Sequence, residues 1–196
     1  SNRFSMNFLR ASKSNQLLFS SLSFRCESLI DLSLAGKNFD RKSVQVFKDF
    51  LTFDQQAQLL EEVLPLFKRK RYESGHWDSV IENYKETEIS DGNWSAQCIE
   101  IIEQIRNAEI FPEKKGPWLP VHAIDLSPEG FIRPHVDSIK FSGSIVAGLS
   151  LLNSACMTLR KEDDPAASKI SMFLPPGSFY VLSGEARYDY THEKEP

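Results

Sequence analysis

The pattern that begins after Trp118 constrains the fold most. From there on, short apolar segments alternate with turn signals, which predicts a series of short strands. These strands cover 119–126, 131–135, 145–151, 157–160, 170–174 and 179–182. Residues 127–130 (SPEG) predict a type I turn, and 175–177 (PPG) predict a type II turn. With helical periodicity confined to the earlier part of the chain, the sequence predicts an α+β fold whose second half is a sandwich or barrel.

Two helices are expected ahead of these strands. The first begins with a capping-box pair, Thr52 and Gln55, and continues through Phe67. Pro65 should kink or shorten it. The second covers 95–108, and its expected buried stripe consists of Cys98, Ile99, Ile102 and Ile105. A short strand is expected around Val44, Val46 and Phe47.

Composition narrows the class of protein. The chain has 196 residues, of which 41% are hydrophobic, and this suits one domain with a sizeable core. Its net charge of -4 excludes a global basic field for nucleic acid. The three cysteines do not form a disulfide framework or a thiolate metal site, which favours a reducing compartment. No apolar run is long enough to span a membrane, and we expect a monomer.

The N-terminal segment differs from the rest. Residues 1–26 contain seven serines, no acid, and the basic residues Arg3, Arg10, Lys13 and Arg25. This composition is typical of a mitochondrial transit peptide and predicts a location in the mitochondrial matrix. The alternative is a disordered basic leader.

Two copies of a His-x-Asp pattern occur in the chain. Residues 135–137 (HVD) follow a predicted strand, whereas residues 76–78 (HWD) precede a capping-box pattern at 79–82 (SVIE) that predicts a helix start. A non-haem iron(II) site needs two imidazoles and one carboxylate on one face of the metal. We therefore predict that His135 and Asp137 are metal ligands and that the earlier copy is structural.

The second imidazole is expected from a later strand. His192 lies 57 residues after His135, with several predicted strands between them. His122 has no carboxylate partner at a useful spacing, and we expect it to be a strand residue at the edge of the core.

Four segments then resemble the AlkB-like Fe(II)/2-oxoglutarate dioxygenases, and within that family its mitochondrial branch. They are 135–141 (HVDSIKF), 147–152 (AGLSLL), 176–180 (PGSFY) and 183–193 (SGEARYDYTHE). The resemblance implies a dioxygenase domain over 44–196, built as a double-stranded β-helix (jelly roll) with N-terminal flanking helices. It implies Fe(II) bound by His135, Asp137 and His192, with O2 and 2-oxoglutarate as co-substrates. It also places Tyr180 in a position to donate a hydrogen bond to 2-oxoglutarate.

Two departures from the family pattern stand out. Where nucleic-acid demethylases of this family have Asn and Tyr, this sequence has Ile124 and Leu126, which argues against DNA repair. The family also has arginines on a strand after the last histidine, one of which pairs with the far carboxylate of 2-oxoglutarate. This sequence ends at Pro196, so we expect the C-terminal strands to be missing, co-substrate binding to be weakened and a sheet edge to be exposed.

Several functions remain open from the sequence. The leading one is hydroxylation or demethylation of a protein, a metabolite or methylated mitochondrial RNA. The acidic net charge favours the first two, and the basic run Lys68, Arg69, Lys70 and Arg71 favours RNA unless it only complements a helix C-terminus. One alternative is a non-catalytic jelly-roll regulator of mitochondrial metabolism or programmed cell death. Another is a metal-dependent cupin-type enzyme that does not use 2-oxoglutarate.

Overall fold

The structure is a computed structural model that describes residues 2–9, 25–75, 80–111 and 117–195. Its strands are β1 (Arg3–Leu9), β2 (Ile30–Leu34), β3 (Val44–Phe47), β4 (Glu73–Ser74), β5 (Ile81–Ile89), β6 (Val121–His135), β7 (Val146–Leu151), β8 (Ala155–Lys161), β9 (Lys169–Leu174), β10 (Phe179–Leu182) and β11 (Tyr190–Lys194). Its α-helices are α1 (Phe53–Phe67), α2 (Ala96–Arg106) and α3 (Gly184–Tyr188), and short 3-10 helices cover Glu27–Leu29, Arg41–Ser43 and Asp91–Asn93. None of the helices in the described ranges is long and apolar enough to cross a membrane.

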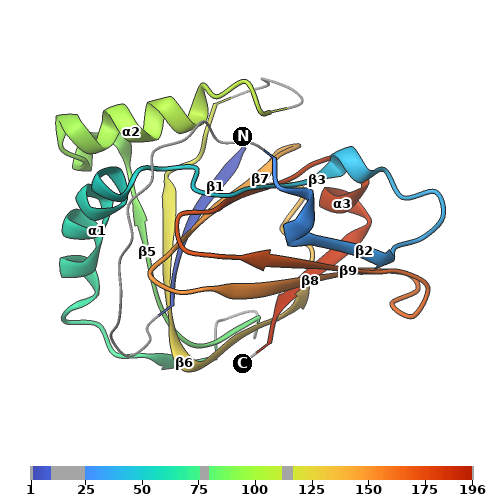
Figure 1. Cartoon of the computed structure of the whole chain (residues 1–196). Helices are drawn as coiled ribbons and strands as arrows, with labels where there is room; N and C mark the ends of the chain where they lie inside the picture. The colour runs from blue at the N-terminus through green and yellow to red at the C-terminus, as the bar shows by residue number, and fades with distance from the viewer. Residues whose placement is uncertain (1, 10–24, 76–79, 112–116, 196) are drawn as a thin grey trace.

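The strands form one curved sheet that folds back on itself in two layers. Hydrogen-bonded neighbours follow the order β2-β9-β8-β11-β6-β1-β7-β10-β3, and β5 pairs with β6 and β4 beside this path. Helices α1 and α2 cover the outer face of one layer, and β8 and β9 lie in the other layer (Figure 1). This arrangement confirms the expected α+β architecture, with helices first and strands after them.

Apolar side chains fill both faces of the helix-covered layer. The outer cluster joins Phe4, Val121 and Leu149 on the sheet to the buried stripes of α1 and α2. The inner cluster lies between the two layers and includes Leu159 and Tyr180. Successive residues of a strand point to opposite faces of the sheet. Alternate side chains of a strand in this layer therefore point toward the helices and toward the space between the two layers.

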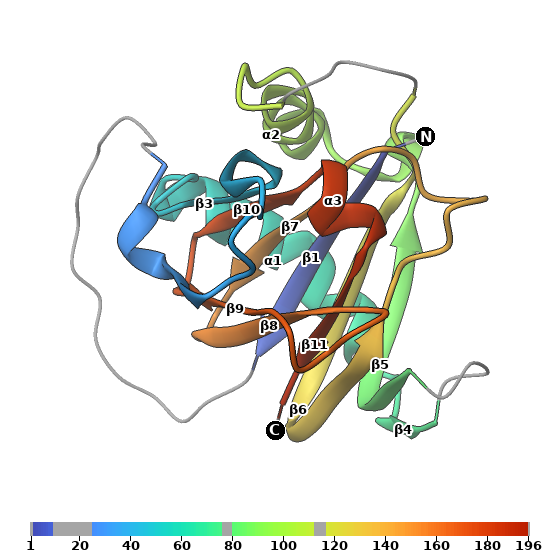
Figure 2. The same cartoon turned by 90° about the vertical axis from the view of Figure 1, so that its right-hand side faces the viewer.

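Strand β1 occupies an internal position in the sheet. It runs parallel to both neighbours, with Ser5 opposite His122 of β6 and Gly148 of β7 (Figure 2). Phe4 and Met6 are buried in the outer cluster. The expectation of a disordered leader is therefore wrong for Arg3–Leu9, which form β1. Residues 10–24 lie outside the described ranges, and the transit peptide stays a prediction.

Both long helices begin where the sequence predicts. Thr52 accepts a hydrogen bond from the backbone N–H of Gln55, and the side chain of Gln55 accepts one from the backbone N–H of Thr52. Pro65 lies in the last turn, and α1 ends at Phe67. In α2 the buried stripe contains Ile101 in place of the expected Ile99.

Strand β6 covers two of the predicted strands and the turn between them. The turn expected at 127–130 lies within it, because a Cβ added at Gly130 would be 3.0 Å from both the backbone N and the backbone O of Ser127, three residues earlier. Only Asn83 of β5 faces these four residues, and its φ of 52° is left-handed. At Gly130 the backbone passes so close to the Asn83 carbonyl that an added Cβ would lie 2.7 Å from its oxygen. Glycine therefore permits this close approach where the chain turns.

The helix expected to begin near 79–82 is also wrong. Residues Ile81–Ile89 form β5, which pairs with β6 along most of its length. Long-range pairing overrides the local capping-box pattern there. In contrast, the type II turn is confirmed, because Gly177 has a φ of 77° and Ser178 donates to the Pro175 carbonyl.

If β1 is part of the folded sheet, Phe4→Ala should lower the free energy of unfolding by about 3–5 kcal/mol, because it removes a buried aromatic side chain. The matched control is Phe53→Ala, since Phe53 is 54% exposed, and its effect should be within about 0.5 kcal/mol. Urea unfolding followed by circular dichroism measures both. Equal small effects would show that residues 3–9 do not belong to the folded sheet.

Candidate metal centre

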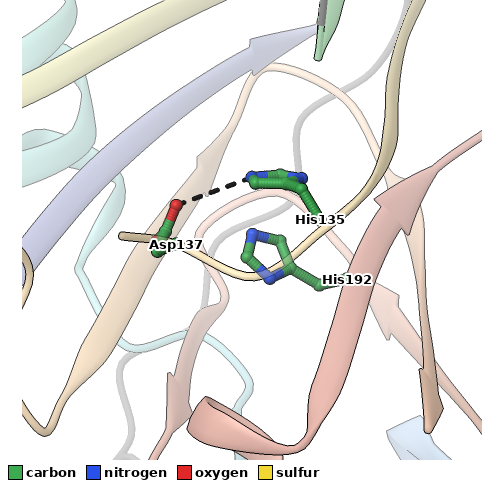
Figure 3. Close-up of side chains that lie close together, drawn as sticks. All are labelled: His135, Asp137 and His192. Carbon is green, nitrogen blue, oxygen red and sulfur yellow. Dashed lines mark ion pairs between the residues drawn. The ribbon is translucent and has the colours of Figure 1, made fainter. Parts of the chain in front are cut away.

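Pairing between β6 and β11 brings the two predicted histidines together. His135 is the last residue of β6, and His192 of β11 is its direct cross-strand partner. Asp137 follows His135 by two residues, on the segment that leaves the strand. Potential ligand atoms of the three residues all lie within 4.8 Å of one another, and Figure 3 shows the three side chains gathered in one place.

The hydrogen bonds of His135 fix its tautomer. Its Nδ1 lies 2.9 Å from the backbone carbonyl of Arg133, which only accepts, so Nδ1 carries the proton. Nε2 is then a free lone pair, and it lies 3.5 Å from Oδ1 of Asp137. A carbonyl that orients one imidazole nitrogen while the other is free is the usual support of a metal-ligating histidine.

Electrostatics keep Asp137 and His192 in metal-binding protonation states. Burial alone would raise the pKa of Asp137, but the nearby His135, His192 and Arg3 outweigh burial and lower that pKa. Burial, followed by the neighbouring His135, lowers the pKa of His192 to about 3. Asp137 is therefore ionised and His192 neutral at pH 7, as metal binding requires.

Arg187 of α3 fixes the segment that carries Asp137. Its buried guanidinium donates hydrogen bonds to the backbone carbonyls of Asp137 (3.0 Å), Ser138 (3.5 Å), Ser142 (3.1 Å) and Gly143 (3.1 Å). A planar fork with several donors suits this role better than a lysine ammonium. Sequence reasoning missed Arg187, because contacts to backbone carbonyls leave no pattern in the side chains of the loop.

Tyr180 of β10 lies in the interior between the two layers. It is 4% exposed. Burial and the charge of Asp137 raise its pKa, so the hydroxyl stays protonated and can donate. Its ring lies against Gly148, where an added Cβ would be 2.4 Å from the nearest ring atom.

His122 lies among charged residues, contrary to expectation. Its Nε2 is 2.9 Å from Oε2 of Glu86 on β5, and its Nδ1 is 2.7 Å from the guanidinium of Arg3. The strand location is correct, but the expected lack of a carboxylate partner is wrong, because β5 was not predicted. Ile124 and Leu126 form an apolar wall with Ile81 and Tyr84.

Two other predicted features lie apart from the three clustered residues. The basic run begins at Lys68, the C-cap of α1, and Lys70 donates a hydrogen bond to the backbone carbonyl of Glu86. That contact ties the run to the edge of β5. Residues 76–79 with the second His-x-Asp copy lie outside the described residues, so the structural role of that copy stays a prediction.

The fold and the His-x-Asp…His cluster together define an Fe(II)-dependent oxygenase domain, and the comparisons with known proteins agree. Residues 43–196 match the 2OG-Fe(II) oxygenase superfamily, and the chain belongs to that family. Fe(II) and 2-oxoglutarate are the metal and co-substrate of the family.

The chain is similar to two mammalian proteins named alpha-ketoglutarate-dependent dioxygenase alkB homolog 7, mitochondrial. It is 42% identical to the mouse protein over 78% of this chain and 67% of that protein. It is 43% identical to the cattle protein over 74% of this chain and 63% of that protein. The chain therefore spans about two thirds of the length of these relatives, and the expected resemblance to the AlkB-like family is confirmed.

Among solved structures, the chain resembles that of OsALKBH1, with a TM-score of 0.55 at 15% identity. The match covers 80% of this chain and 87% of that one. At this identity the likeness concerns the fold alone, and it confirms the expected jelly-roll architecture.

Arg187→Met should weaken metal binding about ten- to a hundredfold, because the Asp137 segment loses its hydrogen-bond donors. The effect should appear in Mn(II) titrations followed by electron paramagnetic resonance. Arg133→Met is the control, since that side chain is 53% exposed and pairs with Glu82. Unchanged affinity in Arg187→Met would show that the segment is ordered without the arginine.

Gly148→Ala should destabilise the protein by about 1–3 kcal/mol, because the new methyl group collides with the Tyr180 ring. Combining it with Tyr180→Ala should remove most of that penalty. Thermal or urea unfolding of both single variants and the double variant measures the coupling between the two positions. Additive effects would contradict the direct contact.

Proposed function

We propose that this chain carries an Fe(II)/2-oxoglutarate-dependent dioxygenase that uses O2 to hydroxylate or demethylate its substrate. The observation that supports this most strongly is the meeting of two imidazoles and one carboxylate within 4.8 Å where the end of β6 pairs with β11. This donor set is the one that non-haem iron(II) oxygenases use, and it leaves coordination positions for co-substrates.

The proposed roles of the residues follow from their contacts. His135, Asp137 and His192 would hold Fe(II), with Nε2 of His135 as its donor atom because Nδ1 is protonated. Arg187 would keep Asp137 in place through the backbone of its segment. Tyr180 would donate its hydroxyl proton in a hydrogen bond to the co-substrate. Iron with 2-oxoglutarate and O2 supplies the oxidising power that replaces a C–H bond by C–OH, and an N-hydroxymethyl product then loses formaldehyde.

The surface beside the cluster favours a protein or metabolite over RNA as substrate. Ile139 and Phe141 project from the segment after Asp137 and are 65% and 68% exposed. Their apolar side chains and the net charge of -4 both disfavour a polyphosphate backbone at this rim. The mammalian relatives are named mitochondrial, and together with the basic N-terminal composition this supports a location in the mitochondrial matrix.

An anaerobic titration with Fe(II) and then 2-oxoglutarate tests the metal centre. We expect the wild-type chain to develop a metal-to-ligand charge-transfer band that His135→Ala lacks, because one imidazole ligand is gone. His76→Ala is the matched control and should retain the band. A band that survives in His135→Ala, or disappears in His76→Ala, would contradict the assignment of the ligands.

A further inference from the structure

The side of β1 that faces the barrel interior is polar. Phe4 and Met6 pack in the outer cluster, so Arg3, Ser5 and Asn7 lie on the opposite face. The guanidinium Nη1 of Arg3 is 3.8 Å from Oδ1 of Asp137, and the Arg3 side chain is 28% exposed. The N-terminal strand therefore places a cation at the metal centre, and this cation remains accessible to a ligand.

Hydrogen bonds from two neighbouring strands orient Arg3. Arginine can only donate, so Nδ1 of His122 must accept from it at 2.7 Å. His122 then carries its proton on Nε2 and donates to Glu86 at 2.9 Å. The chain from Glu86 through His122 to Arg3 holds the guanidinium on the side of the barrel where Asp137 lies.

The charges of the metal, its ligands and a bound dicarboxylate indicate which ligand Arg3 can bind. A divalent ion held by Asp137 and two neutral imidazoles has one net positive charge. A dicarboxylate bound beside it adds two negative charges in a partly buried site, where nearby cations stabilise it. Arg187 is one such cation, and Arg3 is a second, whose planar fork matches a carboxylate.

We propose that Arg3 of β1 binds the second carboxylate of the dicarboxylate co-substrate, the one that 2-oxopentanoate lacks. The N-terminal strand then forms part of the binding site. This inference rests on the proposed function.

Binding measured without turnover tests the proposal. The full chain is loaded with Mn(II), and calorimetry compares 2-oxoglutarate with 2-oxopentanoate, which lacks the second carboxylate. We expect Arg3→Met to weaken 2-oxoglutarate binding about tenfold or more while leaving Mn(II) affinity and 2-oxopentanoate binding within about twofold. The 2-oxoglutarate affinity of Arg3→Lys should fall between those of the wild type and Arg3→Met, since lysine keeps the charge but lacks the planar fork. Arg41→Met, an exposed arginine on a 3-10 helix, is the control.

The outcomes separate this proposal from the proposed function. If the wild-type chain binds Mn(II) but not 2-oxoglutarate, the proposed function fails. If wild type and Arg3→Met bind 2-oxoglutarate equally, Arg3 has no part in binding and only the present inference fails. If Arg3→Met weakens the binding of 2-oxoglutarate and of 2-oxopentanoate to the same extent, Arg3 acts on the structure of the site and not on the second carboxylate. That result also overturns the inference.

Discussion

The candidate site depends above all on the antiparallel pairing of β6 with β11. This pairing sets His192 directly opposite His135, and the ring centroids lie 4.1 Å apart. Because Asp137 follows His135 by two residues, one cross-strand register brings together all three groups. A shift of one residue would turn His192 to the other face and dissolve the cluster. The β11–β8 pairing and the Arg187 contacts keep this register and the segment after it in place.

The second requirement is a closed barrel wall on the side of Asp137. Strand β1 provides it by pairing with β6 and β7 at once, although it lies more than a hundred residues earlier in the chain. Its two faces have different roles. The apolar face joins the core under α1 and α2, and the polar face turns Arg3 toward the metal ligands. The same segment therefore links the stability of the sheet to the charge of the site.

The sequence was informative where the chemistry is local. The His-x-Asp spacing at a strand exit predicted His135 and Asp137, and Thr52 with Gln55 predicted the start of α1, since both depend on neighbours a few residues away. His192 was expected from a later strand, and the pairing of β11 with β6 sets its place. It failed where distant pairing decides. Strand β5 was taken for a helix start because its partner is β6, and the contact of Arg3 with His122 spans 119 positions. Arg187 recognises carbonyl oxygens, which every residue has, so no sequence pattern could indicate it.

The central claim is that β1 and the His135, Asp137 and His192 cluster form one site, and paramagnetic broadening in NMR tests it most directly. Mn(II) bound to the chain should broaden the amide signals of Arg3, Ser5 and Asn7 together with those around His192. Signals from α2, on the far side of the sheet, should be affected least. If the signals of β1 remain sharp while those around His192 disappear, β1 does not line the metal centre, and the account is wrong.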